Sequence, residues 1–449
     1  MSSQPASNES PPQRSLKALA LRSASWAVLG RMLGQGLRLL SNIILARLLF
    51  PEAFGLTAIV GVFIYGLIMF SDLGIGPSIV YNKQGEEPHF LNTAWTIQIL
   101  RGAIIAIGAA MLAWPVAEIY QQPELVGLLA AAGSGSFIQG FESTALHTQQ
   151  RKLELGPVIR LEIMGQVVTI VVMVVWALLS PTVWALVGGS LAGTAAKAAL
   201  SHVYLPRFPH RLHWDREAAR EVYRFGSWIF LSSMFTFIAV QGDRLLLGYY
   251  LSMTMLGVYS VATRFTEALT NLQIGLTHSV LFPVFSETAR SDRDLLTERY
   301  YRVRLWTDLV FLTSAGLLCT AGHVLIDLLY DDRYQEAGWI LQALSIQVSM
   351  SAFLTPGETL LFSLGKTYYA FARSFGRAMW IVIGIPVTWH FGGLNGVVWW
   401  VAFSEVPVLI VTWTGLIKNK LLRPMFELRG LLIWGAAAFL GFMLEALLP

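Results

Sequence analysis

Long apolar segments separated by short polar connectors run through almost the whole chain. Thirteen such segments can be marked. A helix needs about 20 apolar residues to cross a hydrocarbon core roughly 30 Å thick. The pattern therefore predicts an all-α polytopic membrane protein. The predicted spans are 23–48, 54–81, 91–118, 123–148, 156–180, 182–205, 223–247, 254–285, 303–330, 336–362, 367–390, 392–416 and 428–447.

Basic residues are distributed unequally between the two sets of connectors. Of 32 Lys and Arg, 23 fall in the amino-terminal arm and in alternate connectors, with Arg373 and Arg377 counted among them. The opposite connectors contain only Arg333. Connectors that keep Lys and Arg face the cytoplasm, so we expect a cytoplasmic amino terminus. The net charge of +4 reflects this topology and does not indicate a nucleic-acid partner.

Composition supports the membrane prediction and narrows the chemistry. Hydrophobic residues make up 55% of the chain and charged residues 13%, against about 25% charged in soluble proteins. The single cysteine, Cys319, lies inside a predicted span, so an intramolecular disulfide is impossible. The eight His are scattered, and neither a phosphate loop nor a serine-nucleophile elbow occurs. We expect no metal, no cofactor and no enzymatic activity.

The two halves of the chain carry related motifs. Gly55 and Gly74 of span 54–81 have counterparts in Gly257 and Gly275, at offsets of 202 and 201 residues. Transporters use duplicated halves around a central site. The predicted organisation is a disordered cytoplasmic arm (1–22), an N-lobe of six spans (23–205), a cytoplasmic linker on the membrane surface (206–222), a C-lobe of six spans (223–416) and a connector with a thirteenth span (417–449).

Span 23–48 carries a polar stripe. Its residues recur at i, i+4, i+7 and i+11, on one helical face, and are Arg31, Gln35, Arg38 and Asn42. An Arg at the centre of a membrane helix costs about 2.5–3.5 kcal/mol. Arg31 and Arg38 lie about 12 and 22 Å from the start of the span, too deep for both to reach the surface. The stripe predicts an aqueous interior, although salt bridges to acids on other helices remain an alternative.

Further charges lie inside other spans. Arg101 and Arg264 are deep cations, and Arg264 is either a ligand-binding group or the partner of Glu267, one turn away. Arg244 and Lys197 lie nearer the ends of their spans, where long side chains extend to the surface. The acids that could bind a coupling proton or cation, or could pair with a deep arginine, are Asp72, Glu142, Glu267, Glu358 and Glu405.

Several motifs together resemble a known family. They cover residues 29–34, 45–55, 242–244, 256–262 and 282–286. In order and spacing they are similar to the polysaccharide transporters, the Wzx-like lipid-linked oligosaccharide flippases of the multidrug/oligosaccharidyl-lipid/polysaccharide exporter superfamily. The likeness extends over about residues 20 to 420. Family members often have twelve or fourteen spans, whereas thirteen are predicted for this chain.

The resemblance implies a fold and a function. It implies two pseudo-symmetric six-helix lobes that rock about a central cavity in a bacterial inner membrane, with about one extra helix at the carboxyl end. The implied ligand is an undecaprenyl-diphosphate-linked repeat unit of O-antigen, capsule or exopolysaccharide, flipped from the inner to the outer leaflet. A glycan polymerase and glycosyltransferases are the expected protein partners, and membrane lipid surrounds the protein.

The arginines suit such a ligand. A guanidinium group binds phosphate oxygens bidentately and stays charged in a low-dielectric cavity. We therefore hypothesise that Arg31, Arg38 and Arg101, with Arg264 from the opposite lobe, hold the diphosphate, and that polar and aromatic side chains admit the glycan.

Three alternatives remain open at this point. A cation-coupled multidrug antiporter of the same superfamily would favour an acidic cavity over deep arginines. A membrane glycan polymerase or glycosyltransferase would usually carry a large outer loop, and the predicted outer connectors are short. A scaffold without transport activity would have no use for two deep arginines on one helical face.

Overall fold

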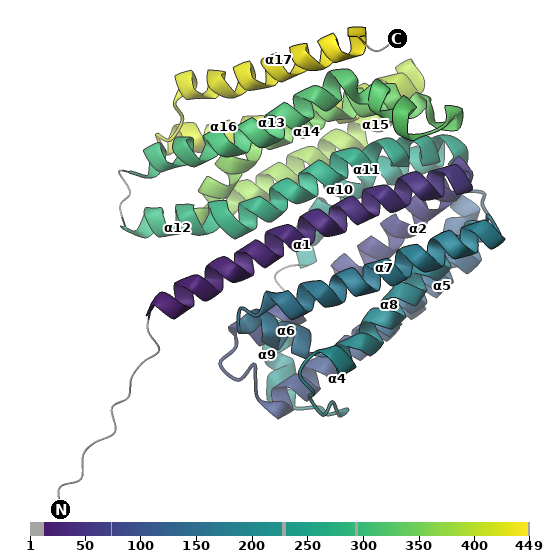
Figure 1. Ribbon diagram of the computed structural model, residues 1–449, viewed down its shortest axis with the longest axis vertical. Coiled ribbons are helices and arrows are strands. Elements are labelled where there is room, and N and C mark those ends of the chain that lie inside the picture. Colours follow the sequence, from purple (N-terminus) through teal and green to yellow (C-terminus); the bar gives the residue numbers. More distant parts are fainter. Residues whose placement is uncertain (1–12, 73, 227–229, 292–294, 448–449) are drawn as a thin grey trace, which may run out of the picture.

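A computed structural model describes residues 13–447, except 73, 227–229 and 292–294, as two helical bundles that lie side by side (Figure 1). No strand occurs in these described residues. The N-terminal bundle contains α1 (Gln13–Leu48), α2 (Pro51–Phe70), α3 (Ile75–Tyr81), α4 (Pro88–Ile119), α5 (Glu124–Gly140), α6 (Ala145–Arg151), α7 (Leu155–Leu179) and α8 (Trp184–Tyr204). Helix α9 (Arg216–Gly226) follows. The C-terminal bundle contains α10 (Phe230–Tyr250), α11 (Met253–Leu276), η1 (Thr277–Leu281), α12 (Phe282–Ser291), α13 (Leu296–Leu329), η2 (Asp332–Tyr334), α14 (Glu336–Ser363), α15 (Tyr368–Ala402), α16 (Val406–Lys418) and α17 (Pro424–Leu447).

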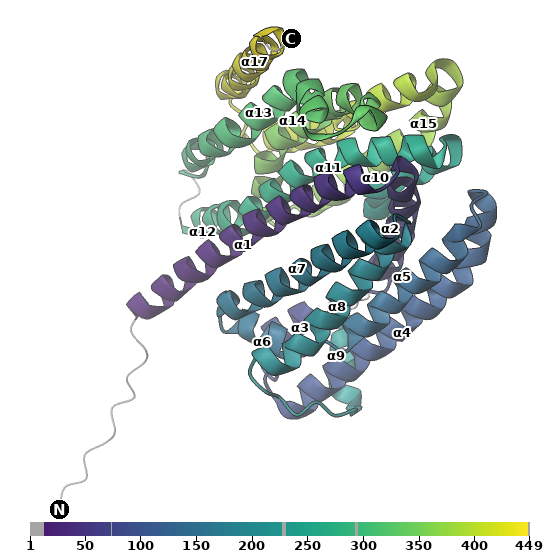
Figure 2. The ribbon, with the colours of Figure 1, turned by 45° about the vertical axis from the view of Figure 1, so that its right-hand side comes forward.

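The apolar helices identify a multi-pass membrane protein. Within the described part of the chain, seven segments are long and apolar enough to cross a membrane by length and composition alone. They are α2, α4, α7, α13, α14, the α15–α16 segment and α17. Helix α1 lies between the two bundles and packs on α7 of one and α11 of the other (Figure 2). The predicted two-lobed helical fold is confirmed, whereas the residue bounds of the lobes and the count of thirteen spans stay predictions.

Two predicted spans are each interrupted and form two helices. Span 54–81 is divided into α2 and α3, and Gly74 between them has a φ of 64°, which favours glycine. Span 123–148 is likewise divided into α5 and α6. In the second repeat, α11 passes into the π-helical turn η1 just after Gly275, the counterpart of Gly74. Both repeats therefore break at the same point, and such π-turns often occur at functional sites.

The ends of the lobes differ from the sequence prediction. Helix α1 begins at Gln13, so residues 13–22 of the predicted disordered arm are helical, because Leu, Ala and Lys extend a helix at little cost. Residues 1–12 of that arm lie outside the described residues. The linker helix α9 packs on α3 and α4, with Ala218 in one apolar cluster with Ile75 and Phe90. Burial of this face holds the linker helix on the N-terminal bundle, and its place on the membrane surface stays a prediction.

The predicted boundary at 390–393 coincides with a break in the helix. Within α15, Gly393 has a φ of 54° and a ψ of −142°, which are not helical. The two segments on either side of it fold back on each other, because the indole nitrogens of Trp380 and Trp400 each donate to the other residue's carbonyl oxygen, at 3.0 and 2.9 Å. A glycine absorbs this change of direction, so the chain turns without a connector.

The two bundles touch most closely at one end of the molecule, which we call the closed end. Here α1 ends, α2 and α11 begin, and η2 lies beside them. A Cβ at Gly55 would collide with the Met253 carbonyl group, and a Cβ at Gly257 would collide with the Pro51 carbonyl group. Pro51 and Met253 are themselves 202 residues apart, so the two repeats cross reciprocally and confirm the predicted duplication.

Polar contacts strengthen the closed end. Arg333 donates to the carbonyl oxygens of Leu49 (3.1 Å) and Ala46 (3.0 Å), which α1 leaves without partners where it ends. The Tyr120 hydroxyl at the end of α4 donates to the Leu245 carbonyl oxygen of α10 at 3.1 Å. The largest apolar cluster also extends across this end, from α2 to α11 and α14. The closed end is therefore a packed contact between lobes.

A buried ion cluster fixes the carboxyl-terminal helix. Arg304 of α13 is 2% exposed, donates to Glu427 of α17 at 2.7 Å and lies 3.3 Å from Asp308. Its guanidinium group also lies over the ring of Phe353, 4.5 Å from the centroid. Because two buried carboxylates share this arginine, α17 is held against α13 as an addition to the second lobe.

Candidate functional site

A cavity between the lobes runs along α1. Its wider part has a volume of about 830 Å³ and lies between α1, α7 and α11. Its narrower part, about 470 Å³, lies towards the closed end between α1, α2, α5 and α8. Both parts share Arg38, Ser41 and Met173, so we treat them as one central cavity. On α1 its wall extends from Ala27 to Leu45, about 27 Å at 1.5 Å per residue.

The polar stripe of α1 faces this central cavity. Arg31 and Gln35 line the wider part, Asn42 lines the narrower part, and Arg38 lines both. Arg31 lies over Gly275 of α11, where the absence of a Cβ leaves room for the guanidinium group. Among the described residues, neither Arg31 nor Arg38 forms an ion pair. The predicted salt-bridge alternative is therefore not what this part of the structure contains.

Asn42 contributes to the closed end as well as to the cavity. Its amide oxygen accepts a hydrogen bond from the Tyr330 hydroxyl at 2.9 Å. Tyr330 stands at the end of α13 in the opposite lobe. A group that bound Asn42 from the cavity would therefore touch a residue that also joins the two lobes.

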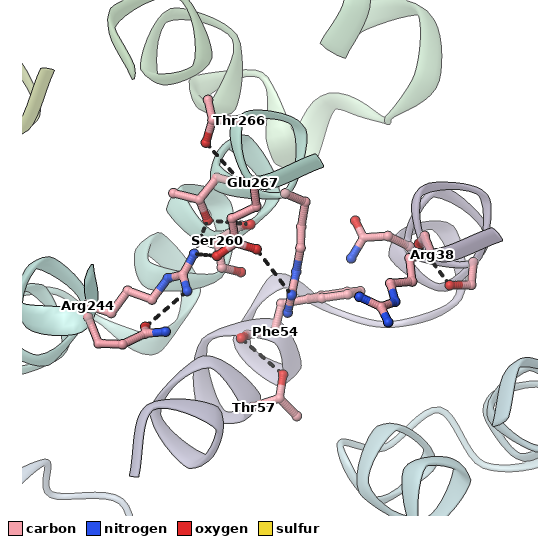
Figure 3. Close-up of polar contacts among 12 residues, drawn as sticks. Arg38, Phe54, Thr57, Arg244, Ser260, Thr266 and Glu267 are labelled. Atoms are coloured by element: carbon pink, nitrogen blue, oxygen red, sulfur yellow. Dashed lines mark hydrogen bonds and ion pairs between the residues drawn. The ribbon is translucent and has the colours of Figure 1, made fainter. Parts of the chain in front are cut away.

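Three arginines and one glutamate lie together at the junction of the lobes (Figure 3). Glu267 is paired with Arg244 and lies 3.7 Å from Arg264, and Arg244 also donates to Thr263 at 2.9 Å. Arg264 lines the narrower part of the central cavity together with Arg38. The predicted pair of Arg264 and Glu267 is confirmed. Asp243 lies close to Arg244 as well and accepts a hydrogen bond from the Tyr259 hydroxyl at 2.7 Å, so three guanidinium groups face two carboxylates and the junction keeps an excess of positive charge.

Arg244 was predicted to extend towards the membrane surface, and this prediction is wrong. Its side chain is 14% exposed and turns inwards to Glu267 of the neighbouring helix. At this depth in the membrane, an ion pair with a carboxylate stabilises a buried guanidinium group more than partial contact with water does. The sequence shows the two residues 23 positions apart but not that α10 and α11 turn them towards each other.

The C-terminal bundle contains a second large cavity of about 970 Å³ between α10, α11, α14 and α15, which we call the C-lobe chamber. Glu358 and Glu405, two of the coupling-ion candidates, line it. Glu358 is paired with Arg373, and Glu405 lies 2.7 Å from Arg377. Both arginines belong to α15 and not to a connector. Each carboxylate therefore has a fixed guanidinium partner, whereas the coupling role stays a prediction.

Arg101 lies apart from the other predicted phosphate ligands. It donates to the Ile68 carbonyl oxygen (2.8 Å) and to Ser71 (3.2 Å), and Asp72 is 3.8 Å away. These groups stand at the end of α2, where the last carbonyl groups lack helical partners and attract a cation. Arg101 lines a smaller cavity of about 280 Å³ that adjoins the central cavity, because Glu162 and Lys197 line both this cavity and the wider part, and Gln139 lines both this cavity and the narrower part. The predicted grouping of Arg101 with Arg31 and Arg38 on one ligand stays a prediction.

Glu142 also faces this smaller cavity. It is 7% exposed, and its carboxylate lies 3.3 Å from Lys197. Lys197 was predicted to extend to the surface, which is wrong, because the buried carboxylate holds it inwards. Asp72 is different: its side chain is 49% exposed and accepts a hydrogen bond from the Gly74 amide.

Sequence reasoning missed one polar stripe. Glu162, Gln166 and Thr169 of α7 recur at i, i+4 and i+7, and all three line the central cavity opposite α1. Gln166 donates to the Gly34 carbonyl oxygen of α1 at 2.8 Å. The same periodicity that identified the stripe of α1 would have found this second one.

Solved structures identify the class of protein. The lipid II flippase MurJ in an inward closed conformation matches with a TM-score of 0.72 and 12% identity, covering 94% of this chain and 93% of that chain. An inward-facing multidrug transporter of the MATE family and MOP superfamily matches with a TM-score of 0.69 and 13% identity, covering 89% and 95%. At these identities the likeness shows the fold. The chain has the two-lobed helical fold of membrane transporters of this superfamily.

The family follows from the sequence comparisons. A family described as "Polysaccharide biosynthesis protein" matches residues 44–339, and the chain belongs to it. The succinoglycan biosynthesis transport protein ExoT of Rhizobium meliloti is 24% identical over 76% of this chain and 68% of its own length. The lipopolysaccharide biosynthesis protein WzxC of Escherichia coli is 22% identical over 91% and 82%. The resemblance inferred from the motifs is confirmed.

Proposed function

We propose that the protein is a flippase that moves an undecaprenyl-diphosphate-linked oligosaccharide across a bacterial inner membrane. The observation that carries the proposal is the pair Arg31 and Arg38, two cavity-facing arginines without a carboxylate partner among the described residues. Arginines that are costly in a membrane and not neutralised by the protein are suited to an anionic ligand. The names of the relatives, which concern succinoglycan and lipopolysaccharide biosynthesis, support the same substrate class.

In this proposal the diphosphate binds where the lobes meet. Arg31 and Arg38 of the first lobe and Arg264 of the second face the central cavity, with Gln35 and Asn42 as neutral donors on the same face. Guanidinium groups from both lobes can then hold one headgroup bidentately. Arg101 takes a supporting role, in that it positions the end of α2. The reaction is transport, and we assign no catalytic residue.

The conformation suits an alternating-access cycle. With the amino terminus in the cytoplasm, as the charge distribution predicts, the closed end faces away from the cytoplasm and the wider part of the central cavity faces towards it. Separation of the lobes at the closed end and their approach at the other end would then release the glycan outside. Glycosyltransferases would supply the substrate and a polymerase would consume it.

Substitution of the two cavity arginines tests the function. Arg31→Ala and Arg38→Ala should each weaken binding of undecaprenyl diphosphate in nanodiscs roughly 10- to 100-fold, since a hydrogen bond to a charged group contributes about 1.5–3 kcal/mol. In cells, both should cause lipid-linked repeat units to accumulate at the inner leaflet. The Lys variants should retain part of the affinity. Arg302→Ala, whose side chain is 73% exposed, is the charge-matched control.

Three results would contradict the proposal. Unchanged affinity of the double variant for undecaprenyl diphosphate would remove the diphosphate site. Unchanged surface glycan together with lost efflux of cationic drugs would favour the multidrug antiporter. Polymer formation by the purified protein would favour the polymerase alternative.

A further inference from the structure

We propose that the C-lobe chamber is the saccharide subsite, a place for the glycan separate from the arginines that hold the diphosphate. This inference rests on the proposed function and deepens it. The chamber has about 970 Å³, enough for roughly 30 waters at about 30 Å³ each, and at the upper end of the usual 300–1,000 Å³ for ligand pockets. A sugar ring or a short oligosaccharide therefore fits it.

The first argument is the chemistry of the wall on α14. Ser351, Thr355 and Thr359 line the chamber at i, i+4 and i+8. Thr355 donates its hydroxyl proton to the Ser351 carbonyl oxygen, and Thr359 donates to the Thr355 carbonyl oxygen, both at 2.8 Å. A hydroxyl group has one donor and two acceptor lone pairs. With their protons directed to their own helix, these oxygens offer only acceptors to the chamber.

The wall on α11, which packs against α14, is built in the same way. Thr266 donates to the Thr263 carbonyl oxygen at 2.9 Å, and Thr270 donates to the Thr266 carbonyl oxygen at 2.8 Å. Thr266 and Thr270 both line the chamber. The two helices therefore present rows of hydrogen-bond acceptors at helical spacing.

Two glutamine amides add to the acceptors. Gln273 donates through its amide nitrogen to the Ala352 carbonyl oxygen at 3.1 Å, and Gln347 donates to the Ser404 hydroxyl at 2.9 Å. Both residues line the chamber. Each amide nitrogen uses one of its two N–H donors between helices, so each side chain keeps one donor and a carbonyl oxygen with two acceptor lone pairs for a ligand.

An acceptor-rich wall selects the ligand class. A polyol such as a sugar carries many O–H donors and matches such a wall, whereas a diphosphate has only acceptors and does not. The balance of charged side chains also favours the glycan in the chamber and the diphosphate in the central cavity. Four carboxylates and three arginines line the chamber, and they are Asp243, Glu267, Glu358, Glu405, Arg244, Arg373 and Arg377. The central cavity has four basic side chains against one carboxylate, and they are Arg31, Arg38, Lys197, Arg264 and Glu162.

The two sites adjoin, as a glycan joined covalently to a diphosphate requires. Asn271 and Ile274 of α11 line both the chamber and the wider part of the central cavity. Glu267 lines the chamber and Arg264 lines the central cavity, and these two side chains form an ion pair. A headgroup bound at Arg264 would therefore have its first sugar at the entrance of the chamber.

Isosteric loss of two hydroxyl groups tests the subsite. In the Thr355→Val, Thr359→Val variant, two acceptor oxygens are replaced by methyl groups of similar shape. Thr414→Val is the matched control, because Thr414 has the same bond to its own helix (2.7 Å to the Ile410 carbonyl oxygen) but is exposed on α16. The probes are undecaprenyl diphosphate and undecaprenyl-diphosphate-linked N-acetylglucosamine, titrated into full-length protein in nanodiscs.

We expect the wild type to bind the sugar-bearing lipid more tightly than the plain diphosphate. The double variant should lose roughly 5- to 150-fold of its affinity for the sugar-bearing lipid and none for the plain diphosphate, since each of the two hydrogen bonds contributes about 0.5–1.5 kcal/mol. The Thr→Ser variants should bind like the wild type. An equal loss with both lipids, or no loss with either, would overturn the subsite.

Other outcomes separate this inference from the proposed function. If the wild type binds undecaprenyl diphosphate no better than neutral undecaprenol, the proposed function fails. If it binds the diphosphate but gains nothing from the sugar, only the subsite fails. If the double variant instead loses a sodium-dependent change in tryptophan fluorescence and no lipid affinity, the chamber is a cation site and the saccharide assignment is wrong.

Discussion

The reciprocal glycine contact at the closed end gives the sharpest test of the conformational cycle. A Cβ at Gly55 would lie 2.8 Å from the Met253 carbonyl carbon, and a Cβ at Gly257 would lie 2.6 Å from the Pro51 carbonyl carbon. Ordinary contact begins at 3.4 Å, so the backbones must separate by at least 0.6 and 0.8 Å, respectively, and by more for the carbonyl oxygens. Overpacking of this kind costs about 1–3 kcal/mol.

This overpacking cost destabilises only the conformation in which the two lobes touch at the closed end. Gly55→Ala and Gly257→Ala should therefore shift the balance between closed-end and open-end conformations roughly 5- to 150-fold towards opening. The two effects should not simply add in the double variant, because both residues take part in one contact. Transport should fall because the cycle must return through the closed state.

Distances between spin labels measure the shift directly. Glu124→Cys in the first lobe and Gln335→Cys in the second place exposed labels at the closed end, in a chain whose only cysteine is removed by Cys319→Ser. We expect a single short distance without the glycine substitutions. Either glycine variant should add a population at longer distance, measured by double electron–electron resonance in nanodiscs.

Gly61→Ala is the matched control for this experiment. Gly61 lies on the same helix α2, and a Cβ there would meet no atom within 4 Å. The Gly61→Ala variant measures the stability, up to about 1 kcal/mol, that a helix gains when alanine replaces an interior glycine. If the Gly55 and Gly257 variants give the same distance distribution as Gly61→Ala, the reasoning about the crossing is refuted.

Two further predictions concern stability. Arg304→Met should lower the stability of the protein by about 3–5 kcal/mol, because Asp308 and Glu427 lose their shared buried counter-charge. The exposed control Arg302→Gln should change the stability by less than about 0.5 kcal/mol. Similar melting temperatures for the two variants in detergent would contradict this prediction. Burial lowers the pKa of His210, in the connector before α9, from 6.5 to about 4, so between these values the unfolded chain binds a proton that the folded protein does not. Stability should therefore fall as the pH falls from 6.5 to about 4, and a His210→Gln variant that melts with the same pH dependence would disprove the assignment.

Much of the fold could be predicted from local patterns. The apolar segments, the polar face of α1 and the duplicated glycines are properties of spacing along one helix, and the bilayer thickness and the 3.6-residue period act on each segment separately. The same local logic could have found Glu162 on α7. The helical start at Gln13 was missed because a disordered composition near the terminus hides the helix formers that follow it.

The sequence by itself determined that the protein crosses a membrane in two related halves and that Arg31 and Arg38 share one helical face with Gln35 and Asn42. The tertiary structure alone decided which charges meet: Arg244 with Glu267, and Arg101 with the end of α2. Such pairs come from helices whose rotation and tilt are set by packing across the whole bundle, and no spacing within one segment encodes them. For the same reason only the folded chain shows the closed end, where residues 202 positions apart come into contact.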